Sequence, residues 1–305
     1  MKYLFGPVQS RRLGVSLGID LLPFKTCSLN CIYCECGPTN NLTTEIKEYV
    51  PTSEVINELK IYLSAKPKID FITFSGSGEP TLHSGIGEII NFIKTNFPQY
   101  KICLLTNSTL LYKASVRMAI KNCDLIMPSF DAYFESSLRK VLRAYSDVTV
   151  SSIIGGIRKI CEEKTCPVII EYFVIPGIND SLNELTELKK FFLDIKPDAI
   201  QLNYLARPGA SVDVPIASVE RLSEIKDFFK PLLVQPIKKL NIHPAQDEET
   251  IKSVLEIINK GISIDDLIIK SGIRANDLMK IIGELENRKL IKTKTEERDY
   301  FFKVE

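Results

Sequence analysis

The segment whose residues are best suited to chemistry contains three closely spaced cysteines, Cys27, Cys31 and Cys34. A loop can wrap thiolates at this spacing around one metal centre. The chain has only two histidines, so a metal site here must be mostly thiolate. A structural zinc ion prefers four closed ligands, whereas three cysteines suit a [4Fe-4S] cluster that leaves one iron open for an exchangeable ligand.

The other cysteines leave alternatives open. Cys36 is a candidate fourth ligand, which would make a zinc site or a closed cluster, although its C-x-C spacing from Cys34 makes joint ligation awkward. We interpret Cys103 and Cys123, which adjoin apolar strand candidates, as core thiols. A further pair flanks a helix–strand connection, where a second cluster is an alternative: Cys161 and Cys166.

The spacing C-x3-C-x-aromatic-C, with Tyr33 as the aromatic residue, resembles the signature of the radical S-adenosylmethionine (SAM) superfamily. The resemblance covers roughly residues 5–230. It implies a [4Fe-4S] cluster on Cys27, Cys31 and Cys34, whose open iron is chelated by the amino and carboxylate groups of SAM. One electron from the reduced cluster then breaks the sulfur–C5′ bond. The resulting 5′-deoxyadenosyl radical abstracts a hydrogen atom from a substrate.

The same resemblance implies a SAM site along the ends of the following strands. Glycines let the backbone at Gly76 and Gly78 approach the methionine moiety, and the Glu79 carboxylate accepts from its ammonium group. Residues after the later strands resemble ribose, carboxylate and adenine contacts. The predicted cofactor-binding set is Tyr33, Gly76, Gly78, Glu79, Asn107, Ser129, Asp131, Ile175 and Gly177.

Substrate contacts are suggested by charged and polar residues at two kinds of position. The opening segment, residues 5–14, resembles a prokaryotic group of wyosine-type tRNA-modifying enzymes and Fe-S oxidoreductases. Within it, Arg11 and Arg12 can clamp a phosphate or carboxylate, or form a surface salt bridge. Polar residues that interrupt apolar strand candidates complete the predicted substrate set: Glu171, Gln201 and Asn203.

Three functions fit these residues. The first is a radical SAM enzyme that acts on a macromolecule, either tRNA or a peptide. True wyosine synthases carry additional cysteines near the N-terminus, and no cysteine precedes Cys27 here, so tRNA guanine chemistry is one option among several. The second is a radical SAM enzyme for a small metabolite, and the third is a non-catalytic zinc or Fe-S transcription regulator. Either enzyme needs a reducing electron donor of the flavodoxin or ferredoxin type.

Elements that position these residues follow an alternating pattern, in which apolar runs of strand length separate segments of helical period such as 52–63 and 180–193. Such alternation predicts a parallel sheet with right-handed crossovers. Polar residues at the C-terminal ends of strands favour a barrel mouth that carries a site. We predict an α/β fold in which residues 1–235 form a radical SAM core, a partial (β/α)6 TIM-like barrel, with an open doubly wound sheet as the alternative. The strand candidates are Val15–Asp20, Phe71–Ser75, Lys101–Asn107, Leu125–Asp131, Val168–Ile175 and Ala199–Tyr204.

Residues 236–305 have a different pattern. Prolines punctuate a linker, after which three helical stripes precede a hairpin candidate, Leu290–Lys294 with Tyr300–Val304. This order predicts a smaller winged helix-turn-helix domain. Its basic and acidic residues are mixed, which favours a protein-recognition or intramolecular role over nucleic-acid binding.

Bulk composition restricts the class of protein further. The formal net charge of +1 gives no sign of a general nucleic-acid-binding surface. No stretch is apolar enough to span a bilayer, and the first residues lack the features of a signal peptide. We therefore expect a cytoplasmic protein with no membrane partner, in which eight cysteines serve thiol or metal chemistry instead of disulfides.

Overall fold

The computed structural model describes residues 1–10, 13–205, 209–211, 213–235, 248–258, 261–271, 273, 278, 281–282, 285, 288–295 and 299–303. The chain divides into two compact units. The first comprises residues 1–34 and 38–239, and the second comprises residues 35–37 and 240–305. Among the helices of the described residues, none combines the length and apolar character needed to cross a membrane.

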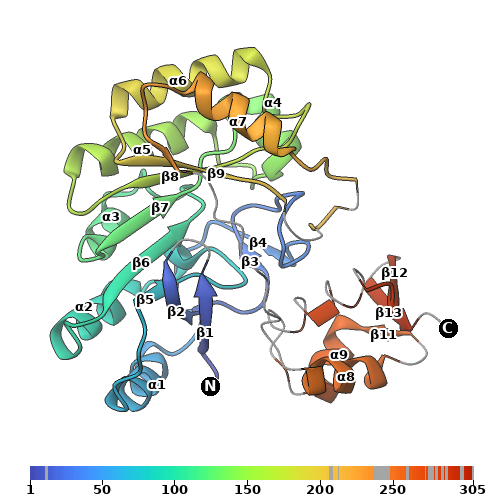
Figure 1. Ribbon diagram of the computed structural model, residues 1–305. Coiled ribbons are helices and arrows are strands. Elements are labelled where there is room, and N and C mark those ends of the chain that lie inside the picture. The colour runs from blue at the N-terminus through green and yellow to red at the C-terminus, as the bar shows by residue number, and fades with distance from the viewer. Residues whose placement is uncertain are drawn as a thin grey trace. The chain divides into compact units, whose positions relative to one another are not determined.

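Parallel strands form the centre of the first unit (Figure 1). One sheet has the order β1-β2-β5-β6-β7, in which β1 (Leu4–Ser10) pairs antiparallel with β2 (Gly14–Ile19) and the others are parallel: β5 (Phe71–Phe74), β6 (Lys101–Thr106) and β7 (Leu125–Pro128). A second parallel sheet contains β8 (Ile169–Phe173), β9 (Ala199–Asn203) and β10 (Val234–Gln235). Parallel bridges from Ile126 to Val168 and from Ser129 to Glu171 join β7 to β8. The two sheets therefore continue one another.

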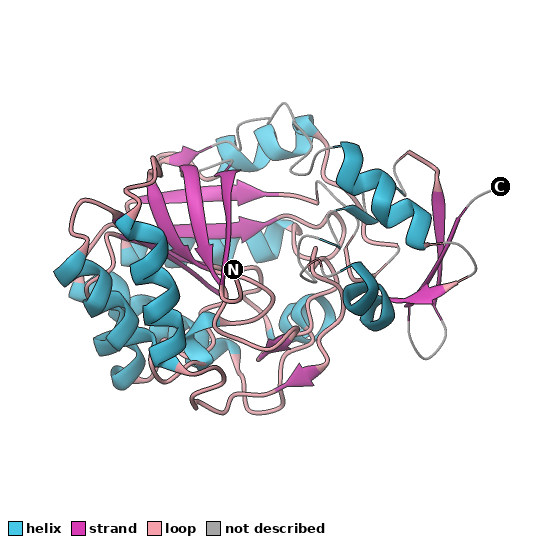
Figure 2. Cartoon of the chain, turned by 90° about the horizontal axis from the view of Figure 1, so that it is seen from below, coloured by secondary structure: helices cyan, strands magenta, loops and turns pink. Residues whose placement is uncertain are grey.

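A helix follows each of the strands β2, β5, β6, β7, β8 and β9 before the next strand of these two sheets begins. These helices are α1 (Thr52–Ser64), α2 (Ile86–Asn96), α3 (Ala114–Ile120), α5 (Val150–Glu163), α6 (Leu182–Ile195) and α7 (Val219–Phe228). Figures 1 and 2 show them on the outer side of the strands. Three short helical segments lie in the connections: η1 (Pro80–Leu82), α4 (Glu135–Ser137) and the π-helical η2 (Leu138–Leu142). The α/β fold with a parallel sheet is confirmed, and its six strand–helix repeats are consistent with a partial barrel.

The hydrophobic pattern explains why these elements form. Residues Leu59, Ile72 and Ile102 are fully buried, as expected for helices and strands packed on a common core. Ser181, at the predicted start of a helix, caps α6 by accepting from the Glu184 N–H (3.2 Å). Each of the six predicted strands is present within a few residues. Four strands of the first unit were not predicted: β1, β10 and the short pair β3 (Thr26–Cys27) and β4 (Asn41–Leu42).

The second unit has its own apolar core, which includes Ile251, Val254 and Leu267. Its described elements are α8 (Glu248–Ile257), α9 (Ile264–Ser271) and a sheet of order β11-β13-β12, formed by Ile262–Ser263, Asp299–Lys303 and Ile291–Thr295. The antiparallel pairing of β12 with β13 corresponds to the predicted hairpin. The predicted third helix lies largely outside the described residues, so the winged-helix assignment stays a prediction.

Candidate active site

The loop that carries the three cysteines, which we call the cluster loop, runs from Lys25 to Thr43. Its base is closed by the parallel pair β3 and β4. The Lys25 carbonyl accepts from the N–H groups of Asn40 (3.1 Å) and Asn41 (3.0 Å), and the Cys27 carbonyl accepts from Thr43 (2.9 Å). The loop follows the C-terminal end of β2, beside the ends of the next strands (Figure 1). A closed base of this kind restricts the conformations of the loop, so less conformational entropy is lost when the three cysteines bind a common ligand.

The upper part of the cluster loop is held by a segment more than a hundred residues later in the chain. The Asn30 N–H donates to the Leu142 carbonyl (2.9 Å), and the Ile32 N–H donates to Val141 (3.0 Å). Both carbonyls belong to η2, a π-helical turn whose wider hydrogen-bond pattern is typical of functional sites. In return, the Ser28 carbonyl accepts from the N–H of Tyr145 (3.0 Å).

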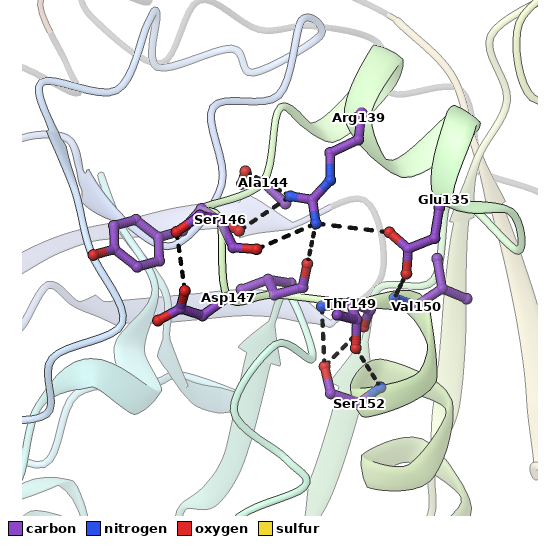
Figure 3. A network of polar contacts seen from close by, with 10 residues as sticks. Glu135, Arg139, Ala144, Ser146, Asp147, Thr149, Val150 and Ser152 are labelled. Carbon is purple, nitrogen blue, oxygen red and sulfur yellow. Dashed lines mark hydrogen bonds and ion pairs between the residues drawn. The ribbon is translucent and has the colours of Figure 1, made fainter.

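Arg139 holds the turn that follows η2 (Figure 3). Its guanidinium donates to a series of main-chain carbonyls, those of Ala144 (3.0 Å), Tyr145 (3.1 Å), Ser146 (3.4 Å) and Val148 (2.6 Å). It also pairs with Glu135 (3.7 Å), whose carboxylate accepts from the Val150 N–H (2.6 Å). Because the turn includes Tyr145, Arg139 indirectly fixes the backbone that supports the cluster loop.

The predicted glycine turn packs directly on the cluster loop. A Cβ at Gly78 would lie 1.9 Å from the Thr26 carbonyl oxygen, and the Glu79 N–H donates to that same carbonyl (3.3 Å). At Gly76, where φ is +131°, a Cβ would meet the Asp20 carboxylate at 2.3 Å. The glycines were predicted to admit the methionine moiety of SAM. In the structure they are required for close packing against the protein itself, which joins the two loops.

Glu79 is buried and serves as an internal anchor. Its Oε1 accepts from the Thr81 N–H (3.1 Å), the Thr81 hydroxyl (2.5 Å) and the Thr106 hydroxyl (2.6 Å), and its Oε2 accepts from the Asn107 N–H (2.7 Å). Burial raises the pKa of the carboxyl group, and these donors oppose that rise. Three donors thus surround Oε1, whereas Oε2 accepts from the Asn107 N–H.

The three thiols lie half-buried and close enough to influence one another. Burial, followed by the Glu79 carboxylate, raises the pKa of Cys27 to about 11. The pKa of Cys31 is raised well above its usual value, first by burial and then by Cys34 and Cys27. Cys27 and Cys31 therefore hold their protons at neutral pH in the bare protein, so metal binding would release them.

Two side-chain donors point at the sulfurs. The Asn107 amide lies 3.4 Å from Cys27 Sγ and 2.9 Å from the Ser28 hydroxyl, and the Lys25 ammonium lies 3.0 Å from Cys34 Sγ. Donors of this kind fit anionic sulfur better than neutral thiol, because charge-assisted hydrogen bonds are the stronger ones. Within the described residues, no group of three or more His, Cys, Asp or Glu is placed to hold a single metal ion. In a four-iron cluster each thiolate binds a different iron, so its ligands need not converge on one point.

Tyr33 connects the cluster loop to the ends of β7 and β8. Its ring stacks on Phe173 with centroids 3.9 Å apart, and its hydroxyl donates to Asp131. The other Asp131 oxygen accepts from the Phe173 N–H (2.7 Å). Burial raises the pKa of Asp131 to about 7. Tyr33 and Asp131, predicted as separate SAM contacts, thus form one buried unit.

The turn after β8, residues 174–181, we call the β8 turn. Asn179 is fully buried; its Oδ1 accepts from the Ile175 N–H (2.7 Å), and its amide donates to the carbonyls of Phe173 (2.7 Å) and Asp131 (2.9 Å). Gly177, with φ of +74°, donates from its N–H to Asp180 (2.6 Å). Ile175 is buried, and Gly177 alone of the predicted adenine contacts is exposed.

Most of the remaining predicted residues lie on or beside strands β7 to β9, and two lie outside the residues that the structure describes. Asn203 donates to Glu171 Oε1 (2.7 Å), and Ser129 lies beside Glu171 in the bridge between β7 and β8. Gln201 instead donates to the main chain of the neighbouring strand, at Gln235 (3.0 Å). The last two predicted substrate residues, Arg11 and Arg12, lie outside the described residues.

Sequence reasoning missed two residues that this geometry makes prominent. Lys25 directly precedes β3, the strand that contains Cys27. Its proximity to the cysteines in the sequence is the one signal that could have indicated it. Arg139 lies shortly after the predicted residues Ser129 and Asp131, but no sequence pattern marked it.

Fold and site together define a class of protein: a parallel α/β sheet with outer helices, whose strand ends carry a thiol-rich loop suited to an iron–sulfur cluster. Comparison with known proteins gives the family. Residues 21–189 match the model of the Radical SAM superfamily. The chain therefore belongs to the radical SAM superfamily.

Similar curated proteins cover different shares of their own length. A UPF0026 protein of Helicobacter pylori (strain 26695) is 33% identical over 77% of this chain and 76% of that protein. A UPF0026 protein of Methanocaldococcus jannaschii is 28% identical over 99% of this chain and 96% of its own. A protein of Brachyspira hyodysenteriae named GTPase Obg is 37% identical over 75% of this chain, but the match spans only 34% of that protein.

Solved structures share the fold at low sequence identity. A radical SAM methyltransferase from Sphaerobacter thermophilus superposes with a TM-score of 0.55 at 18% identity, covering 72% of this chain and 66% of that one. A structure of TYW1 with a lysine-pyruvate adduct bound gives a TM-score of 0.51 at 17% identity, covering 70% of this chain and 72% of that one.

Superfamily membership establishes the cofactors. Radical SAM enzymes use a [4Fe-4S] cluster and SAM, so this chain is an enzyme with those two cofactors. The superfamily also generally needs a reductant. The non-catalytic regulator considered from the sequence is not favoured.

Proposed function

We propose that Cys27, Cys31 and Cys34 hold the [4Fe-4S] cluster and that SAM lies along the strand ends from β5 to β8. The observation that carries this proposal is the set of bonds that join the cluster loop to those strand ends. Glu79 donates to Thr26 on one side, and Tyr33 donates to Asp131 on the other. A ligand on the cluster would therefore also lie beside the glycine turn and the β8 turn.

The chain's own residues prepare this site in defined ways. When bound, the cluster and SAM supply a reductive cleavage whose 5′-deoxyadenosyl radical can abstract a hydrogen atom. Lys25 and Asn107 donate to the cysteine sulfurs. The ring of Tyr33 stacks on Phe173 and ties one side of the loop to β8. Open positions at the exposed Gly177 and half-buried Ser129 suit contacts to the nucleoside.

The test of the cofactor site is a matched set of cysteine variants. After anaerobic reconstitution, Cys27→Ala, Cys31→Ala and Cys34→Ala should each lose the four-iron cluster and reduce 5′-deoxyadenosine formation under dithionite to background. Cys36→Ala and the core variant Cys103→Ala should retain both. Iron per protein, the absorbance of the cluster and chromatography of the nucleoside are the measurements.

Retention of four irons and nucleoside formation by any of the first three variants would contradict the ligand assignment. Loss of iron in Cys36→Ala alone would instead make Cys36 a ligand.

For the substrate, we propose a macromolecule, either tRNA or a peptide, that reaches Glu171 and Asn203 inside the strand ends. The support is architectural: the chain devotes a second compact unit with its own core to a task beyond the barrel. That unit contains most of the predicted linker and winged-helix domain, residues 236–305, which would present the substrate. A donor protein of the flavodoxin or ferredoxin type would supply the electron.

Deuterium transfer tests this substrate class. An extract of cells grown in heavy water is separated into macromolecular and small-molecule fractions, and each is incubated with the reconstituted protein. Deuterium in 5′-deoxyadenosine from the macromolecular fraction supports the proposal, and prior ribonuclease or protease treatment distinguishes tRNA from peptide. Transfer from the small-molecule fraction alone would contradict it.

A further inference from the structure

Lys25 is an unusual lysine because its side chain is only 3% exposed. Its backbone is left-handed, with φ of +55°, so the chain reverses direction here as it enters the cluster loop. This conformation brings Nζ to 3.0 Å from Cys34 Sγ. An ammonium group removed from water is costly unless anionic or hydrogen-bonding partners compensate it. An anionic sulfur is such a partner.

The donors around the sulfurs differ in charge. Cys27 accepts from the neutral amide of Asn107 at 3.4 Å, whereas Cys34 accepts from a cation at the shorter distance of 3.0 Å. Lys25 is therefore the charged donor to a cysteine sulfur that these contacts show.

We propose that Lys25 is a positioning residue that donates to the Cys34 sulfur of the cluster and raises the reduction potential of that cluster. This inference rests on the proposed function, since it needs the cluster on these cysteines. Reduction adds one electron, from a low-potential donor protein or dithionite, and no bond at Lys25 forms or breaks. A fixed cation nearby stabilises the added negative charge. It therefore stabilises the reduced cluster more than the oxidised cluster, which raises the reduction potential.

Substitution of Lys25 should leave the loop backbone intact. Its carbonyl, not its side chain, makes the bonds to Asn40 and Asn41 that close the loop base. Every non-glycine replacement meets the same left-handed backbone, so the variants are matched in backbone strain. They differ only in what they present to the sulfur.

The experiment compares four variants by redox titration of the reconstituted cluster, followed by electron paramagnetic resonance without SAM. Lys25→Met removes charge and donor, Lys25→Gln keeps a neutral donor, and Lys25→Arg keeps both. Lys60→Met, on the exposed side of α1, is the control for loss of a lysine charge. At a fixed potential we expect the reduced-to-oxidised ratio to fall about tenfold in Lys25→Met, a one-electron shift of ~59 mV.

Lys25→Gln should lie between Lys25→Met and the wild type, and Lys25→Arg and Lys60→Met should match the wild type. If Lys25→Met and Lys25→Gln both fail to retain iron while Lys25→Arg retains it, the cation is needed to hold the anionic cluster, which supports the proposal. A wild-type potential in Lys25→Met, or an equal shift in Lys60→Met, would overturn it.

These outcomes are separate from those of the proposed function. Failure of the wild-type protein to assemble four irons would remove the proposed function itself. A normal cluster with an unchanged potential in Lys25→Met would remove only the role of Lys25.

Discussion

The cluster loop and the β8 turn both belong to the candidate site, but they are held in place in different ways. The cluster loop depends on distant partners, such as the Leu142 carbonyl and the Asn107 amide. The β8 turn has many bonds within its own stretch of chain, such as those of Asn179 to Ile175 and of Gly177 to Asp180, although Asn179 also bonds to Asp131 and Asp180 pairs with Arg221. The difference teaches that nearby residues can supply much of the support of a turn, whereas the metal-binding loop here depends more on partners from distant parts of the chain.

The largest effect should come from Glu79→Gln, which alters the anchor between the glycine turn, β6 and the cluster loop. Donors surround both oxygens of the Glu79 carboxylate, but an amide has only one accepting oxygen. In the variant, the amide NH2 group must therefore face at least one of these buried donors. We expect a loss of about 4 kcal/mol in the free energy of unfolding, together with poor iron retention. Anaerobic urea unfolding and iron counting measure the two effects, with the exposed Glu88→Gln as control. Full iron retention would break the proposed dependence of the cluster loop on distant anchors.

Asn179→Ala tests the β8 turn. It leaves the Ile175 N–H and the carbonyls of Phe173 and Asp131 without their buried partner, which should cost about 3 kcal/mol. Because the bonds to Ile175 and Phe173 are local and the Asp131 carboxylate keeps its bond to Tyr33, the variant should still assemble a cluster, in contrast to Glu79→Gln. Urea unfolding and iron content are again the measurements, and the exposed Asn122→Ala is the control. Equal iron loss in Asn179→Ala and Glu79→Gln would erase the contrast.

Arg139→Gln tests the remote support of the cluster loop. Loss of the carbonyl contacts should reduce stability by about 1–2 kcal/mol and hasten iron loss to a chelator. Arg158→Gln is the control, because the two side chains are 41% and 39% exposed and Arg158 contacts no main-chain carbonyl of the turn: it pairs with Asp194 and lies over the Phe191 ring. That variant should change stability by less than about 1 kcal/mol. If both variants release iron at the wild-type rate, η2 does not stabilise the loop.

The smallest effect is a pH dependence at His83, which ties the chain downstream of the cluster loop to η1. His83 accepts from the Gly85 N–H (3.1 Å) and its other nitrogen lies 2.8 Å from the Val50 carbonyl, an arrangement of the neutral ring. Burial lowers the pKa of His83 below its ordinary value of 6.5.

The unfolded chain therefore takes up the proton first as the pH falls below 6.5, and the folded state loses stability down to its own lower pKa. His83→Gln should flatten the dependence of the urea midpoint on pH across this window. An unchanged slope would show that another group controls the acid sensitivity.

Several features were determined by the sequence alone. The alternation of apolar strands with helical stripes gave the six parallel strands within a few residues, because period and length are local properties. Cysteine spacing and Tyr33 indicated the superfamily before any geometry was known, and the Asn179-Asp180-Ser181 run marked the start of α6. Each of these signals lies within a short stretch of chain.

Only the tertiary structure decided what the site residues contact. In the folded chain Glu79 accepts from buried donors of the protein, and the Tyr33 hydroxyl donates to Asp131. Gln201 donates to the main chain of the neighbouring strand. The fold also brought Lys25 to Cys34 and Arg139 to the support of a loop a hundred residues away. Hydrogen-bond partners at strand ends are set by how strands from distant parts of the chain align, and no local pattern records that alignment.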